Sequence, residues 1–235
     1  RADFSDALLH FGFPPCPGNI MIGNPQWSQT IDGFIRQIKG WVLTPDGYSA
    51  MNLGVFFDAV SVAGNADLLH RAKSAMADMM RGESAYLARF AKAIDQFDDA
   101  SASMLSSLMA TVGVGSDTIH IKKSGVFPIV HGVRVMSIDE GITATSTAER
   151  LDELAKIEVI GSGLAGDIKS ALSYFMEVRL RSQLVAMRTG RHEEEAIVRL
   201  SQLSSRERDL LREALKVVKR FKELADKKHE IFDED

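Results

Sequence analysis

The feature that most constrains the fold is the spacing of apolar residues, which returns to the same helix face through most of the chain. Helices are expected over residues 31–42, 51–60, 68–75, 83–97, 126–138 and, less regularly, up to Arg188. The clearest stripe runs through Leu210, Leu211, Ala214, Leu215, Val218, Phe221 and Leu224. Such helices must bury their apolar faces against one another, and short connections favour antiparallel neighbours. We therefore predict an all-α, antiparallel bundle of about seven or eight helices.

Local signals place some helix ends within this pattern. Ser146 with Glu149, and Ser204 with Glu207, form capping boxes that predict helix starts at Ser146 or Thr147 and at Ser204. Gly190 is a good C-terminal stop for the long helix before it.

The first 26 residues differ from the rest. Residues 12–18 contain three prolines and two glycines and must form a loop, and Asn19–Ile22 is a short apolar run that predicts a strand. We interpret residues 1–26 as the tail of an α/β domain that continues upstream of Arg1. Residues 27–235 are then a helical domain, which divides into sub-bundles at 27–111 and 118–235.

Composition narrows the class of protein. The net charge is −4, which argues against a protein that coats nucleic acid. The single cysteine, Cys16, excludes an internal disulfide, and neither a bilayer-spanning run nor a signal peptide is present. We expect a cytoplasmic protein with no nucleic-acid or membrane partner.

Catalytic patterns are missing from the chain. Gly115-Ser116 invites comparison with the phosphate-gripping turn of nucleotidyltransferases, but Val126, Phe127 and Pro128 stand where an Asp-x-Asp pair for Mg²⁺ is required. The six histidines show no metal-ligand spacing, and Cys16 has no evident base. The sequence therefore predicts no catalytic residue and no metal site in this chain.

Basic residues offer the best binding candidates. Lys122 and Lys123 precede a predicted helix start, where free N–H groups attract anions. Helices carrying Arg134, Arg150, Arg179 and Arg181 can converge on that point, although ordinary surface charge is the alternative. Arg179 and Arg181 are two positions apart and do not share a helix face, so at most one enters a common cleft. Separately, Asp58 lies in an apolar stretch. If its carboxylate is buried, it requires an Arg or Lys partner, because an unpaired buried charge is costly.

Several segments together resemble a known family. These are the loop from Gly12 to Met21 with Asn24-Pro25-Gln26-Trp27, Phe56-Phe57-Asp58 with Gly64, Ile121-Lys122-Lys123-Ser124-Gly125 with Pro128 and Arg134, Thr145-Ser146-Thr147 with Arg150-Leu151, and Arg179-Leu180-Arg181-Ser182-Gln183-Leu184. In this order they resemble the end of the nucleotidyltransferase domain, and then the helical substrate-binding domain, of bacterial CBS-domain signalling proteins. Val60 and His120 depart from that pattern, which has Arg and Asp there.

The resemblance implies an activity for the intact protein and not for this chain alone. The family is similar to protein-PII uridylyltransferases, so a nucleotidyl group would pass from a nucleoside triphosphate to a protein such as a PII-like regulator, with magnesium. The Gly-Ser and Asp-x-Asp residues would lie upstream of Arg1. Lys122, Lys123, Arg134, Arg150, Arg179 and Asp58 would serve substrate or phosphate binding.

Three interpretations stay open at this point. In the first, which we prefer, the chain is a non-catalytic wall of a nucleotidyltransferase cleft. In the second it is a regulatory protein-interaction module without enzymatic activity. In the third it is a structural bundle that forms a homodimer. The partners expected are the upstream nucleotidyltransferase and CBS domains.

Overall fold

A computed structural model describes residues 1–43, 47–80, 118–189 and 197–230, in two compact units, Arg1–Gly82 and Glu83–Asp235. Within these residues there are eight α-helices and one two-stranded sheet, so the prediction of a mostly helical protein is confirmed. No helix in the described ranges has the length and apolar character to cross a bilayer. The helix expected over residues 83–97 lies outside the described residues.

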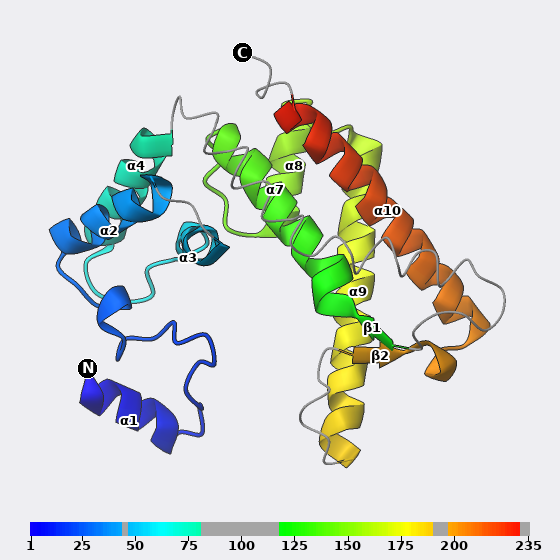
Figure 1. Cartoon of the computed structure of the whole chain (residues 1–235), viewed down its shortest axis with the longest axis horizontal. Coiled ribbons are helices and arrows are strands. Elements are labelled where there is room, and N and C mark those ends of the chain that lie inside the picture. Colours follow the sequence, from blue (N-terminus) through cyan, green and yellow to red (C-terminus); the bar gives the residue numbers. More distant parts are fainter. Residues whose placement is uncertain (44–46, 81–117, 190–196, 231–235) are drawn as a thin grey trace. The chain divides into compact units, whose positions relative to one another are not determined.

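The first unit contains four α-helices, α1 (Ala2–His10), α2 (Ile31–Leu43), α3 (Gly47–Phe57) and α4 (Ala66–Met80) (Figure 1). Their apolar faces bury Ile38 and Trp41 of α2, Leu53 of α3 and Met76 of α4. Asn65 caps α4 as its sequence position suggests, since its side-chain oxygen accepts from the Asp67 amide at 2.9 Å.

The strand expected at Asn19–Ile22 is wrong. Residues 19–22 contain no regular strand and instead form turns, closed by Asn19 N–H to the Cys16 carbonyl at 2.9 Å. Asn19 has φ 54°, a left-handed conformation that interrupts an extended backbone. The neighbouring prolines remove donors that strand pairing would need.

The second unit is a bundle of helices with a small two-stranded sheet beside α9. Its α-helices are α7 (Phe127–Asp139), α8 (Thr147–Lys156), α9 (Ser162–Thr189) and α10 (Ser205–Glu230). Strand β1 (Thr118–His120) pairs antiparallel with β2 (Ile197–Arg199), which places Ile119 opposite Val198. Figure 1 shows α9 antiparallel to α10, its longest neighbour, and the C-terminal half of α9 reaching beyond α7.

The bundle is held by side chains from all four of the α-helices described in this unit. Ile129, Val133 and Met136 of α7 meet residues of α8, α9 and α10 that are at most 3% exposed, namely Leu151, Leu154, Ile168, Phe175, Leu211, Leu215, Val218 and Phe221. Each such large apolar side chain contributes about 1.5–3 kcal/mol on burial. Except for Leu210, which is 46% exposed, the apolar stripe predicted for the last helix is thus the face that packs on the rest of the bundle.

Both predicted helix starts are confirmed, and the capping box is complete at Ser204, where Glu207 also accepts from the Ser204 amide. The Ser146 hydroxyl accepts from the Glu149 amide at the start of α8, and the Ser204 hydroxyl accepts from the Glu207 amide at the start of α10. Between β1 and α7 the chain makes a π-helical turn, η3 (Lys122–Val126), which the sequence did not predict. This turn buries Ser124 and Gly125 and leaves the two lysines outside.

Candidate binding pocket

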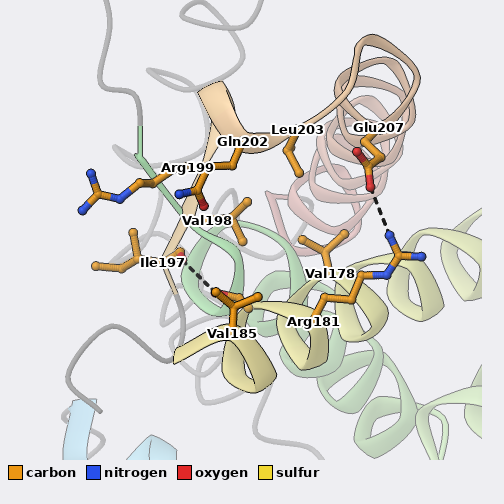
Figure 2. A pocket seen from close by; sticks show the side chains of 10 residues that line it. Val178, Arg181, Val185, Ile197, Val198, Arg199, Gln202, Leu203 and Glu207 are labelled. Carbon is orange, nitrogen blue, oxygen red and sulfur yellow. Dashed lines mark hydrogen bonds and ion pairs between the residues drawn. The ribbon is translucent and has the colours of Figure 1, made fainter. Parts of the chain in front are cut away.

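A pocket of about 220 Å³ lies beside the C-terminal half of α9. Its other walls are β2, the short 3-10 turn η5 (Leu200–Gln202) and the start of α10 (Figure 2). The lining residues are Val178, Arg181, Ser182, Val185, Ile197, Val198, Arg199, Gln202, Leu203 and Glu207.

The local sequence explains how the apolar part of the pocket is built. Val178, Ser182 and Val185 are spaced so that they share one face of α9. The Ser182 hydroxyl donates to the Ile197 carbonyl at 3.0 Å, which fixes β2 against that face. In β2 the side chain of Val198 points to the opposite side from those of Ile197 and Arg199, toward the interior of the unit, and is 6% exposed. The result is an aliphatic floor made by α9 and β2 together.

The charged part of the pocket is an ion-pair cluster around Arg181. One guanidinium nitrogen lies 2.6 Å from Glu177 and another lies 3.0 Å from Glu207. Figure 2 shows Arg181 and Glu207 facing each other on one side of the pocket, whereas the Arg199 guanidinium extends away from its centre. Because Arg181 is 60% exposed, these pairs contribute little to stability, and their main effect is to fix the guanidinium.

The Glu207 carboxylate is also hydrogen-bonded to Ser204. Its second carboxylate oxygen accepts from the Ser204 hydroxyl at 2.7 Å and from the Ser204 amide at 2.8 Å. These two hydrogen bonds, with the Arg181 charge, hold the pKa of Glu207 below its ordinary value. Glu207 is therefore a fixed negative charge at neutral pH.

Tyr174 also contacts Glu207, through the Glu207 backbone. Its hydroxyl donates to the Glu207 backbone carbonyl at 2.8 Å, which joins α9 to the first turn of α10. Burial and the nearby Glu207 carboxylate raise the pKa of Tyr174, so the phenol stays a neutral donor.

The sequence candidates occupy different environments. Lys122 and Lys123 are exposed on η3, and Arg134 is half-buried on α7. Arg150 is fully buried, and its Nε donates to the Ala144 carbonyl at 2.6 Å, which ties the α7–α8 connection to α8. Arg150 therefore does not share the solvent-facing surface of the two lysines, and it is not the surface charge offered as the alternative.

Asp58 and Arg179 are also placed. Asp58 is half-buried just beyond the end of α3, so it is not inside a helix as expected, and it belongs to the first unit. Arg179 follows Phe175 by one turn of α9, with its Nε buried. Of Arg179 and Arg181, only Arg181 lines the pocket, as their spacing allows.

Most pocket residues were not predicted from the sequence. Ile197-Val198-Arg199 carried a weak strand signal, two β-branched residues before a polar one, directly ahead of the Ser204 capping box. No group of three or more His, Cys, Asp or Glu side chains that could hold a metal lies in the parts of the chain that the structure describes.

The second unit is thus a helical bundle with an open pocket beside α9. Residues 84–229 match the family described as "putative nucleotidyltransferase substrate binding domain", and residues 1–48 match the family described as "putative nucleotidyltransferase". Since the first match covers more than half of the chain, the protein belongs to the substrate binding domain family. No curated protein and no solved structure matches the chain.

Proposed function

We propose that the second unit binds the protein acceptor of a nucleotidyltransferase, and that the pocket beside α9 receives an apolar side chain of that acceptor. The family description supports substrate binding, and the pocket supplies a place for it. The observation that carries the proposal is the pairing of an aliphatic floor with a rim whose charges are already matched.

The rim charges favour a protein over a nucleoside triphosphate. A triphosphate needs several cations that are free to meet its oxygens. Here the Arg181 guanidinium already lies between the carboxylates of Glu177 and Glu207. Those carboxylates would repel a polyanion, and Glu207 stays ionised at neutral pH because its pKa is lowered. An apolar centre with a polar rim is the usual arrangement of protein–protein interfaces.

The finer proposal concerns the whole reaction. A nucleotidyl group would pass from a nucleoside triphosphate to a PII-like regulator. In the upstream nucleotidyltransferase domain a Gly-Ser turn would hold the phosphates and an Asp-x-Asp pair would hold magnesium, and CBS domains would relay a signal. This chain's own part is to hold the acceptor through Val178, Val185 and Val198. The alternative is a regulatory module that uses the same pocket without chemistry.

Methyl-labelled NMR of the chain tests the choice of ligand. We expect N-acetyl-leucine amide or N-acetyl-tyrosine amide to shift the methyl resonances of Val178, Val185 and Val198. We expect Mg²⁺ with ATP or UTP to leave them unchanged. Val185→Asp, at a 53% exposed pocket position, should abolish the shifts of Val178 and Val198, whereas Leu210→Asp, at a 46% exposed α10 position outside the pocket, should keep them. Shifts with nucleotide and none with either amide would contradict the proposal.

A transfer assay separates the two functions. In a protein that joins this chain to a nucleotidyltransferase domain, we expect labelled nucleotidyl transfer to a PII-like acceptor. Val185→Asp should lower kcat/KM for the acceptor by about tenfold or more, since a buried apolar contact is worth over 1.4 kcal/mol. Amide binding without any transfer would favour the regulatory module.

A further inference from the structure

The outward face of α9 changes character halfway along the helix. In its first half that face carries Lys169 and the exposed Ser173. In its second half the same face carries Met176, Leu180, Leu184 and Met187, which are 46%, 55%, 45% and 65% exposed. Large apolar side chains aligned on one helix face mark an interaction surface, whereas scattered ones are ordinary.

This stripe lies apart from the pocket. None of its four residues lines the pocket, which is built on the face that carries Val178, Ser182 and Val185. The surface therefore has to be explained separately from acceptor binding.

The stripe is nearly symmetric about Ser182. Leu180 and Leu184 lie two residues before and after Ser182, and Met176 and Met187 lie six before and five after it. The flanking charges are opposite in sign at the two ends, with Glu177 five residues before the centre and Arg188 six after it. Reversing the direction of the helix therefore places apolar on apolar and acid on base.

A two-fold symmetric interface requires this kind of self-complementary surface. We propose that α9 pairs antiparallel with α9 of a second copy of the chain, with the two-fold axis near Ser182. Leu180 packs on the partner's Leu184, and Met176 lies near the partner's Met187. Glu177, which pairs with Arg181 of its own chain, also meets the partner's Arg188 at both ends. The interface is small, so the dissociation constant is expected to be on the order of micromolar.

Sedimentation equilibrium of the chain tests this association. We expect a reversible dimer whose population rises through the micromolar range. Leu184→Glu should leave a monomer, and the matched control Leu210→Glu, at 46% exposure on α10, should leave the dimer intact. A wild-type chain that stays monomeric, with a melting temperature lowered by Leu184→Glu, would overturn the proposal by showing that the stripe is covered within one chain.

Disulfide trapping tests the direction of the helices. With Cys16→Ser as the background, chains carrying Leu180→Cys are mixed with chains carrying Leu184→Cys and oxidised. Antiparallel pairing predicts crosslinked dimers in the mixture and few with either variant alone. Efficient crosslinking of each variant alone, and not of the mixture, would overturn it.

A charge exchange tests the ends of the interface. Glu177→Arg and Arg188→Glu should each weaken self-association by about tenfold or less, because each creates two like-charge contacts. Mixing the two variants should restore dimers, since every Glu177–Arg188 position is again matched between unlike chains. A mixture no more associated than its components would show that these charges do not meet.

Discussion

The backbone of Gly125 lies against the ring of Phe175. A β-carbon at Gly125 would come within 2.8 Å of three atoms of that ring, which real β-carbons essentially never do. The contact joins the π-helical turn η3 to α9, and the Phe175 side chain is fully buried. Neither partner has space to move freely, because the ring sits in the shared core of the second unit.

We expect Gly125→Ala to lower the free energy of unfolding by about 1–3 kcal/mol through overpacking, measured by urea denaturation. Gly166→Ala on α9 is the matched control: its β-carbon would meet nothing within 4 Å, and we expect about 0.5–1 kcal/mol of stabilisation. The Gly125→Ala penalty should shrink in a Phe175→Leu background. Equal penalties in both backgrounds would show that the ring is not the cause.

Arg150 is expected to act in stability. Arg150→Ala removes the bond to the Ala144 carbonyl and leaves a cavity in the bundle, so it should cost about 2–4 kcal/mol in the same denaturation measurement. Arg206→Ala, on the exposed first turn of α10, should change stability by less than about 0.5 kcal/mol. A wild-type-like Arg150→Ala protein would return Arg150 to the list of ligand-binding candidates.

The Glu207 capping box should make the free energy of unfolding decrease at low pH. The folded protein has the lower pKa, so this contribution is fully present above the unfolded value of about 4.3 and is lost as pH falls through the folded pKa. We expect the stability difference between wild type and Glu207→Gln to shrink below about pH 4. Ser204→Ala, which removes the first cause of the shift, should show a weaker acid dependence. A difference that is the same at pH 7 and pH 3 would contradict this assignment.

Tyr174 should show the opposite dependence. Its folded pKa is raised, so its contribution is present below the unfolded value of about 10 and is lost as pH rises through the folded pKa. Tyr174→Phe should cost about 1 kcal/mol at pH 7 by losing the bond to the Glu207 carbonyl, and this cost should fall above about pH 10. Ultraviolet phenolate absorbance of the variant and the wild type would locate the late-titrating tyrosine.

Local patterns allowed much of the bundle to be predicted. Ser146 and Ser204 mark helix starts because capping depends only on the next three residues. The apolar stripe of α10 likewise follows from spacing alone. The helical assignments of α8 and α10 therefore needed little tertiary information.

The pocket could not be predicted in the same way. It depends on β2 pairing with β1, a contact between residues about eighty positions apart, for which a three-residue strand carries little signal. The burial of Arg150 depends on a carbonyl in a connecting loop. Lys122 and Lys123 follow a helix-start pattern, but whether an anion binds there is not determined by that pattern.

The extra residue in the π-helical turn Lys122–Val126 determines which side chains of α7 face the core. Deleting one position from this turn would rotate α7 by about 100° relative to β1. Val130, Arg134 and Ser137 would then take the core positions of Ile129, Val133 and Met136, which would bring the half-buried Arg134 into the apolar core. A shortened natural relative can keep this core only if it also loses, or relocates, the sheet that anchors the turn.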